Sequence, residues 1–315
     1  MNSNTEKIAF VFPGQGSQFV GMGKDLADAF PHAKEVFLSA DEQLGFALSS
    51  TAWFGPQDQL DDTINTQPAL LVHSLAALQV LWSEFPTIQP AFVAGHSMGQ
   101  LSALYAAQAI DQAGVLDLVR TRGRLMKQAG ISNPGGMAAI LGLDIPLLEQ
   151  ICSTASTPNE IVQVANDNCP GQVVISGASP ALERAMQLAR DAKARRVVAL
   201  AVSIAAHSPL MQPAQAEFNQ AVDQSPLRDP TILVIGNVSA SPLSTADQLR
   251  ADLQAQLTSR VRWTESIQSM LNQGVTTFLE IGSGSVLSGL IKRISREVRC
   301  VNLGAPQDFE NFRTG

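Results

Sequence analysis

The feature that most constrains this 315-residue chain is a G-x-S-x-G pentapeptide at residues 95–99. The apolar run before it, residues 91–94, predicts a buried strand, and the Ala- and Leu-rich run after it, residues 100–110, predicts a helix. Between a strand and a helix, such a pentapeptide is typical of a nucleophile elbow, a sharp turn that lifts a serine hydroxyl above a sheet. Ser97 would then lie at a helix N-terminus, where free N–H groups stabilise a developing oxyanion. The alternative is an ordinary strand-loop-helix turn.

Composition places the chain among globular proteins with a sizeable core, since 45% of its residues are hydrophobic. No apolar run reaches the roughly 18 residues of a membrane-spanning helix, and a net charge of −7 argues against nucleic-acid binding. The three cysteines, Cys152, Cys169 and Cys300, lack C-x-x-C spacing, which argues against a disulfide framework or a zinc site. Residues 1–7 show no signal-peptide pattern. We therefore expect a cytoplasmic protein with no metal, membrane or nucleic-acid partner.

Both ends of the chain alternate between strand and helix patterns, as in an α/β protein. Residues 8–12 are apolar throughout and predict a central parallel strand. The Pro-Gly-Gln-Gly loop that follows, residues 13–16, predicts either a ligand-binding loop, because its glycines let the backbone approach a ligand, or a simple βα turn. The other elements expected here are helices at 22–30, 33–44, 69–85 (opened by Thr66-Gln67-Pro68), 112–129, 248–257, 263–272 and 286–294, and strands at 231–235 and 276–281.

The middle of the chain, residues 136–202, has a different order of patterns. Strands are expected at 137–141, 161–164, 172–176 and 196–200, helices at 145–155 and 180–193, and a turn at 166–171. The order β-α-β-β-α-β is that of a ferredoxin-like unit. Since patterns of the first type resume after it, we expect this unit to be an insertion. We therefore predict one subdomain formed by residues 1–133 and 203–315 and a second formed by residues 134–202.

One arginine interrupts the apolar face of the helix expected at residues 112–129, for which Asp111 is the predicted N-cap. At about 100° per residue, Arg122 falls in the middle of the side that carries Val, Leu and Met residues. An arginine in such a place is rarely buried without a partner. Either an internal Asp or Glu pairs with it or it binds an anionic ligand, and the helix pattern excludes neither.

A serine nucleophile needs a base within hydrogen-bond reach, and the chain has only four histidines. His32 lies between surface helices, and His73 lies inside a helix, where packing is its commonest role. His96 precedes Ser97 directly, and adjacent side chains on a tight turn point apart. His207 follows a long apolar run, at the expected end of a strand, and comes after the serine as in the hydrolase order. His207 is therefore the predicted base.

No acidic residue stands out as a third member beside this serine and histidine. Asp223 and Asp229 are candidates by position alone. A backbone carbonyl or a side-chain amide would orient an imidazole equally well.

Five motifs together carry a resemblance to a known family, and they lie at residues 12–18, 95–100, 122–126, 166–171 and 203–207. With them in this order, the chain resembles the malonyl-CoA:acyl carrier protein transacylases, the free-standing acyltransferases of fatty-acid and polyketide synthesis. The resemblance covers residues 8–302. It implies an α/β fold in which an α/β-hydrolase-like large subdomain with a parallel sheet carries an inserted ferredoxin-like small subdomain.

The resemblance also implies roles for individual residues. Ser97 matches the acylated serine and His207 its base. The main-chain N–H groups of Gln15 and Met98 match the oxyanion hole, and Arg122 matches the arginine that pairs with the substrate's free carboxylate. No acid completes the dyad, because a backbone carbonyl at the position of Gln256 orients the histidine. The residues that match the pocket lining are Gln67, Met126, Asn168, Ala206 and Val286.

The sequence departs from the family's usual pattern near the serine and near the base. Met98 and Gln100 stand where the usual motif G-H-S-L-G-E has Leu and Glu. Ala206 precedes the base where relatives often carry Phe or Ser, and a smaller side chain there would widen the acyl pocket. The resemblance therefore implies an acyltransferase more firmly than it implies strict malonyl selectivity.

The implied reaction is a ping-pong transfer of a malonyl group from malonyl-CoA, a coenzyme A thioester substrate, to the phosphopantetheine thiol of an acyl carrier protein. No bound cofactor or metal is implied. The alternatives are an acyl-thioester hydrolase with an editing role, an acyltransferase for another carboxyacyl-CoA such as methylmalonyl-CoA, an ordinary esterase, and a non-catalytic relative. Arg122 favours a carboxylated acyl group, and the presence of Ser97 and His207 argues against a non-catalytic relative.

An acidic carrier protein would need a local basic surface on this acidic chain. Two basic clusters are candidates, Lys193 with Arg195 and Arg196, and Lys292 with Arg293, Arg296 and Arg299. A solvated charged face explains each cluster equally well.

Overall fold

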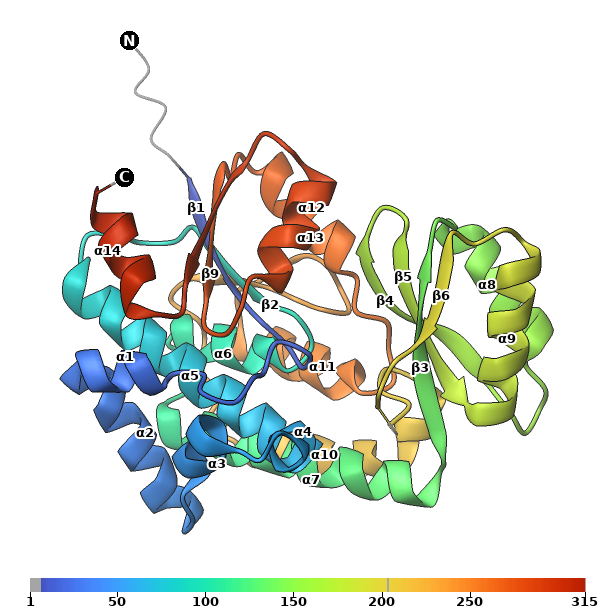
Figure 1. The fold of residues 1–315 in the computed structure, drawn as a ribbon, viewed down its shortest axis with the longest axis horizontal. Helices are drawn as coiled ribbons and strands as arrows, with labels where there is room; N and C mark the ends of the chain where they lie inside the picture. The colour runs from blue at the N-terminus through green and yellow to red at the C-terminus, as the bar shows by residue number, and fades with distance from the viewer. Residues whose placement is uncertain (1–6, 203, 315) are drawn as a thin grey trace.

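The structure is a computed structural model that describes residues 7–202 and 204–314 (Figure 1). It is an α/β protein with two separate sheets, as the sequence predicts. Residues 1–6, which belong to the segment without a signal-peptide pattern, lie outside the described residues. So does Ser203, the first residue of the motif at 203–207. No helix in the described ranges combines the length and the hydropathy needed to cross a membrane.

The larger sheet is a mixed sheet with the strand order β10-β9-β1-β2-β7-β8. Every neighbouring pair is parallel except β7 with β8, which is antiparallel. Its strands are β1 (Ile8–Phe12), β2 (Phe92–Gly95), β7 (Leu233–Ile235), β8 (Pro242–Leu243), β9 (Thr277–Ile281) and β10 (Arg299–Leu303).

Apolar residues of β1 fill a core on each face of this sheet. Because successive side chains of a strand point to opposite faces, Phe10 and Phe12 enter one core and Ala9 and Val11 enter the other. The continuous apolar run of this strand therefore reflects burial on both faces. The helices of this part are α1 (Lys24–Ala29), α2 (Pro31–Leu44), α3 (Leu48–Phe54), α4 (Gln57–Asp61), α5 (Thr63–Glu84), α6 (Gly99–Ala106), α7 (Gln112–Ser132), α10 (Gln212–Gln224), α11 (Ala246–Gln256), α12 (Trp263–Asn272), α13 (Val286–Ile294) and α14 (Pro306–Thr314), with a short 3-10 turn η1 (Pro209–Met211).

Helix α5 begins earlier than the sequence predicts. Its N-cap is Asp62, whose side chain accepts from the main-chain N–H of Ile64, and Pro68 lies inside the helix. A proline has no N–H for the carbonyl four residues before it. Here Arg120 Nη1 donates to that carbonyl, the oxygen of Ile64, at 2.6 Å. A side chain from α7 therefore replaces the hydrogen bond that the proline removes.

The smaller sheet is antiparallel, with the strand order β4-β5-β3-β6. It consists of β3 (Gly135–Leu141), β4 (Val162–Cys169), β5 (Gln172–Ala178) and β6 (Arg196–Ala199), and α8 (Ile145–Ala155) and α9 (Ser179–Asp191) complete its core. Figure 1 shows both helices on the side of the sheet that faces away from the larger sheet. The predicted element order is confirmed.

The turn expected at residues 166–171 is shorter than predicted. Strand β4 continues to Cys169, with register shifts between Val164 and Asn166 and between Asp167 and Cys169. Polar residues such as Asn166 and Asp167 are typical of turns, but here their main-chain groups pair with neighbouring segments. Only residues 170 and 171 are left to form the turn.

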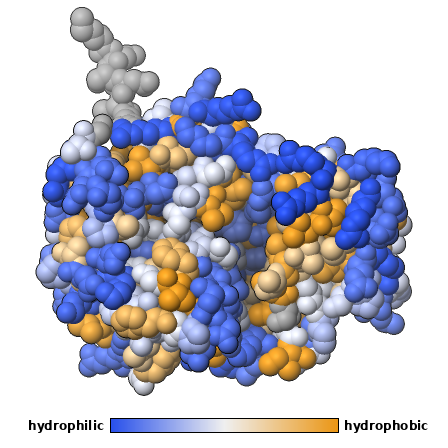
Figure 2. Space-filling view, viewed as in Figure 1, coloured by the Kyte–Doolittle hydropathy of each residue, from blue (hydrophilic) through white to orange (hydrophobic). Residues whose placement is uncertain are grey.

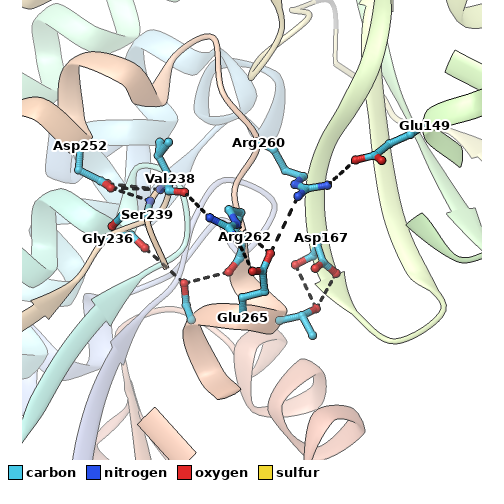
Figure 3. A network of polar contacts seen from close by, with 11 residues as sticks. Glu149, Asp167, Gly236, Val238, Ser239, Asp252, Arg260, Arg262 and Glu265 are labelled. Carbon is cyan, nitrogen blue, oxygen red and sulfur yellow. Dashed lines mark hydrogen bonds and ion pairs between the residues drawn. The ribbon is translucent and has the colours of Figure 1, made fainter. Parts of the chain in front are cut away.

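Strand β4 also connects the smaller sheet to the larger part of the molecule. The main-chain N–H of Asp167 donates to the carbonyl oxygen of Val261 at 2.9 Å, and the N–H of Val261 donates to the oxygen of Ala165 at 2.8 Å. Figure 3 shows side chains that strengthen this junction, where Arg260 pairs with Glu149 of α8 at 2.9 Å. The position of β4 relative to the larger sheet is thereby fixed.

Candidate active site

The pentapeptide at residues 95–99 forms a sharp turn between β2 and α6. Ser97 has a φ of 54°, in the left-handed region that residues with side chains rarely adopt. A Cβ at Gly95 would lie 1.9 Å from the carbonyl oxygen of Gly99, and a Cβ at Gly99 would lie 2.3 Å from the oxygen of Phe12. Both glycines are therefore needed for the chain to turn this tightly.

Asn237 holds the turn in place, although no motif in the sequence points to it. Its Oδ1 accepts from the main-chain N–H of Ser97 at 2.7 Å, and its Nδ2 donates to the carbonyl oxygen of Gly95 at 2.7 Å. Asn237 follows β7, the neighbour of β2 in the sheet, and is buried. The only signal that could have found it is its place after the carboxyl end of a parallel strand, beside the elbow.

The structure brings Ser97 and His207 together. Ser97 Oγ and His207 Nε2 are 2.7 Å apart, and His207 Nδ1 lies 2.9 Å from the carbonyl oxygen of Gln256. Because a carbonyl only accepts, Nδ1 carries the proton and Nε2 accepts from the serine hydroxyl. Burial, and next the nearby Arg122 cation, lower the pKa of His207 to about 3. The imidazole is therefore neutral at physiological pH and able to take a proton.

The apolar run before His207 predicts that this residue lies at the end of a strand, and that prediction is wrong. Strand β6 ends at Ala199, and His207 lies in an irregular segment with a φ of 59°. Its carbonyl oxygen accepts from Gln163 Nε2 of β4 at 2.8 Å. Several apolar residues before His207 line the cavity described below. Their apolar character therefore reflects the cavity wall and does not indicate a buried strand.

Neither acid proposed by position lies at the histidine. Asp223 accepts from Gln254 Nε2 at 2.7 Å, and Asp229 accepts from the main-chain N–H of Ala246 at 2.7 Å. The group that orients the imidazole is the main-chain carbonyl of Gln256.

Arg122 is buried, with 2% of its surface exposed, and its guanidinium points at the serine. Nη1 donates to Gln67 Oε1 at 2.8 Å, and Nη2 donates to Gln256 Oε1 at 2.9 Å and to Ser97 Oγ at 3.1 Å. No acidic side chain pairs with it in the part of the chain that the structure describes. Burial lowers the pKa of Arg122 to about 9. Of the two explanations for this arginine, the internal salt bridge is therefore wrong.

A cavity of about 210 Å³ lies above Ser97, between the two sheets. Figure 2 shows the surface hollowed there, with hydrophobic side chains gathered on the side of the smaller sheet. The predicted site residues that line it are Gln15, Ser97, Met98, Arg122, Met126, Asn168, Ala206, His207 and Val286.

Gln67 differs from its expected place, and His96, about whose place no prediction was made, joins the lining. Gln67 does not line the cavity but lies fully buried behind Arg122, where its Nε2 donates to Thr63 Oγ1 at 2.8 Å. His96, which was set aside as a base, does line the cavity, and its Nε2 lies 2.8 Å from Asn168 Oδ1. Burial lowers the pKa of His96.

Gln15 and Met98, the two residues predicted to form the oxyanion hole, both line the cavity. Among the described residues neither main-chain N–H donates to a protein acceptor. Thr63 Oγ1 donates to Gln15 Oε1 at 3.1 Å, which ties the loop after β1 to α5. Within residues 7–202 and 204–314, no group of three or more His, Cys, Asp or Glu side chains is placed to hold a metal ion.

Comparisons with known proteins agree with this geometry. Residues 9–306 match the family model of the acyl transferase domain. The malonyl CoA-acyl carrier protein transacylase of Bacillus subtilis is 44% identical over 304 residues, which cover 96% of this chain and 95% of that protein.

Solved structures of such enzymes superpose on nearly the whole of this chain. The acyl-carrier-protein-S-malonyltransferase of Bartonella henselae superposes with a TM-score of 0.93 at 40% identity, covering 98% of both chains. A malonyl-transacylase in complex with its type II PKS acyl-carrier protein gives a TM-score of 0.94 at 39% identity, covering 97% of this chain and 98% of that one. The chain therefore belongs to the acyl transferase family, among its malonyl CoA-acyl carrier protein transacylases.

Proposed function

We propose that this protein transfers a malonyl group from malonyl-CoA to the phosphopantetheine thiol of an acyl carrier protein, through an acyl-enzyme on Ser97. One observation carries the proposal. A buried arginine, with no acidic partner among the residues that the structure describes, lies 3.1 Å from the hydroxyl of a serine that is hydrogen-bonded to a neutral histidine. The names of the relatives, and the neighbour solved with its acyl-carrier protein, support it.

In the first half-reaction, Ser97 Oγ attacks the thioester carbonyl carbon while His207 Nε2 takes the hydroxyl proton. The main-chain N–H groups of Gln15 and Met98 stabilise the oxyanion. The intermediate then collapses: the carbon–sulfur bond breaks, and the departing CoA sulfur takes the proton from the His207 imidazolium. The malonyl group remains as an ester on Ser97.

In the second half-reaction, the carrier protein's pantetheine thiol gives its proton to His207 and its sulfur attacks the ester carbonyl. The carbon–oxygen bond breaks, and Ser97 Oγ takes the proton back from the imidazolium. The malonyl group leaves as a thioester of the carrier protein. Gln256 keeps the imidazole in the required tautomer throughout, through its main-chain carbonyl.

Arg122 would bind the free carboxylate of the malonyl group. A guanidinium matches a carboxylate with two parallel hydrogen bonds, and the surrounding low dielectric strengthens them. Gln67 and Gln256 supply neutral oxygens that hold the guanidinium without neutralising its charge. This charge disfavours a hydrolase for uncharged acyl groups. The small side chain of Ala206 in the lining favours, as a second candidate, a branched carboxyacyl group such as methylmalonyl.

The fold supports the same assignment. We infer that residues 134–202 form a ferredoxin-like subdomain inserted into an α/β-hydrolase-like subdomain of residues 1–133 and 203–315. The order of elements and the strand order of the smaller sheet support this division. The cytoplasmic location expected from the unpaired cysteines stays a prediction.

Intact-mass measurement tests the function directly. Mixed with malonyl-CoA, the wild-type protein should gain the mass of one malonyl group and lose it again when holo acyl carrier protein is added. Ser97→Ala should gain nothing. A stable adduct on Ser97→Ala would contradict the role of the serine, and loss of the acyl group to water at the same rate without carrier protein would indicate a hydrolase.

A further inference from the structure

A buried carboxylate lies next to the elbow helix α6 and outside the lining of the cavity. Asp252 of α11 is 5% exposed, and its two oxygens accept from four N–H groups. Three are the main-chain N–H groups of Asn237, Val238 and Ser239, at 2.8, 3.2 and 3.0 Å, and Figure 3 shows two of these contacts. The fourth donor is the side-chain amide of Gln100, whose Nε2 lies 2.8 Å from Oδ2.

Two buried amides connect this carboxylate to Arg122. Gln100 Oε1 accepts from Gln256 Nε2, and Gln256 Oε1 accepts from Arg122 Nη2 at 2.9 Å. Gln100 and Gln256 are 0% and 1% exposed. Gln256 Nε2 also donates to the carbonyl oxygen of Ser97 at 3.1 Å. The chain of hydrogen bonds therefore runs from Asp252 through two neutral amides to the guanidinium beside the serine.

The groups at the two ends of this series of hydrogen bonds, a carboxylate and a guanidinium, allow the two amides between them only one orientation. A carboxylate accepts and a guanidinium donates, so neither end can reverse its role. Gln100 must present its NH₂ to Asp252, which turns its oxygen toward Gln256. Gln256 must then donate to that oxygen, which turns its own oxygen toward Arg122. A flipped Gln256 would place its NH₂ against the guanidinium and leave a buried donor without an acceptor, which is costly.

We infer that Gln100 and Asp252 are positioning residues that fix the amide of Gln256, and through it hold the Arg122 guanidinium where it receives the substrate's carboxylate. The inference rests on the proposed function. It explains how a cation is kept in the site without a neutralising partner: the negative charge lies two amides away, where it orients the arginine's acceptor but does not occupy the arginine's donors.

Gln100→Met tests the relay, because methionine has a similar length but neither an amide donor nor an amide oxygen. We expect kcat/KM for malonyl-CoA to fall by about tenfold or more relative to kcat/KM for acetyl-CoA, the size expected for a hydrogen bond to a charged group. Gln100→Glu keeps an oxygen facing Gln256 but can donate to Asp252 only while its carboxyl is protonated, so it should restore malonyl preference at acidic pH and lose it as the pH rises. If Gln100 had a merely structural role, Gln100→Met would lower kcat/KM for malonyl-CoA and acetyl-CoA by the same factor, and Gln100→Glu would give no such rescue.

A double-mutant cycle separates action through Arg122 from other effects. In an Arg122→Ala background, Gln100→Met should no longer change the malonyl to acetyl ratio. Should Gln100→Met fail to fold, Gln100→Asn takes its place, because its shorter side chain cannot reach both Asp252 and Gln256. The relay is wrong if the ratio is unchanged in the single variant, or if it changes equally with and without Arg122. A wild-type protein that is not malonylated on Ser97 would instead contradict the proposed function.

Discussion

Ser97 and His207 both lie in the left-handed region of backbone conformation, at φ values of 54° and 59°. Residues other than glycine rarely adopt such backbone angles. The resulting backbone strain persists only where surrounding groups hold the residue in place. Asn237 binds the main chain at Ser97, and Gln163 binds the carbonyl of His207. The geometry of the pair is therefore held by side-chain amides from other segments as well as by the contact between the two side chains.

The low pKa of His207 gives a testable pH profile. Burial opposes protonation of the imidazole, so its pKa of about 3 lies well below the ordinary value of 6.5. The base should thus stay neutral as the pH falls, and kcat/KM for malonyl-CoA, which reports the free enzyme, should be flat from about pH 8 to about pH 5. The measurement is the initial rate of self-acylation at subsaturating malonyl-CoA. A profile that loses half its value near pH 6.5 would show a solvated, unperturbed histidine.

At this scale, the sequence identifies side chains that belong to a motif and misses those that support them. Elimination among four histidines leads to His207, and the helix pattern isolates Arg122. Asn237, Gln163 and Asp252 were not predicted, because polar residues without a motif resemble surface residues in a sequence. Their functions arise only when segments 44 to 152 residues apart meet. Gln67 was expected in the lining because the resemblance places it near the site. A resemblance does not show whether a side chain faces the cavity or lies behind it, as Gln67 does.

Among the elements, the strand–turn–helix unit from β2 to α6 has the least tolerance for substitution. Gly95→Ala would place a Cβ 1.9 Å from the oxygen of Gly99, and we expect it to lower the free energy of unfolding by about 3 kcal/mol or more. Gly289→Ala is the matched control, because this glycine is exposed in α13 with nothing within 4 Å of the added methyl group. There the substitution should raise stability by about 0.5–1 kcal/mol. Denaturant unfolding measures both, and equal effects would contradict the account of the turn.

Elements with a continuous apolar pattern were predicted well, and elements whose ends depend on distant partners were not. Strand β1 and helix α12 have the predicted bounds. Helix α5 is predicted to span residues 69–85 and to be opened by Thr66-Gln67-Pro68, because a local pattern does not show that an arginine from α7 bonds the carbonyl that an interior proline leaves free. Strand β4 was cut short for a similar reason, since its polar end pairs with the segment at Val261. The sequence pattern around each element shows neither the arginine of α7 nor the segment at Val261.

On the scale of the whole molecule, the cavity depends on both sheets. Ser97 and Arg122 come from the larger part, whereas Asn168, which also lines the cavity, lies on β4 of the smaller sheet. Gln163, also on β4, holds the carbonyl of His207. The junction between β4 and Val261 therefore fixes the distance between the base and the rest of the lining.

One of the two basic clusters lies close to this cavity. Helix α13 carries Lys292 and Arg293, and it also supplies Val286, Leu287 and Leu290 to the lining. Arg293→Glu should therefore slow transfer to an acidic carrier protein by about twofold to fivefold and weaken its salt dependence, while self-acylation by malonyl-CoA stays unchanged.

Arg195→Glu, in the other cluster, is the matched charge reversal. It should leave both half-reactions as they are if docking uses α13. The measurement is the rate of each half-reaction against ionic strength. Docking on α13 is wrong if Arg195→Glu has the larger effect, and docking is not electrostatic if both half-reactions respond equally to salt.

The central claim of this account is that amide side chains of α5 and α11 hold Arg122 of α7 beside Ser97 without neutralising its charge, so that it selects a carboxylated acyl group. The most direct test is the ratio of kcat/KM for malonyl-CoA over acetyl-CoA in the wild type, Arg122→Ala and Arg122→Lys. Arg122→Ala should cost about 2–5 kcal/mol in malonyl transfer, the range for breaking a buried charge pair. Acetyl transfer should be unchanged or faster, and lysine should restore the preference only in part. If malonyl and acetyl transfer fall by the same factor, Arg122 is a structural residue and the claim of carboxylate recognition is wrong.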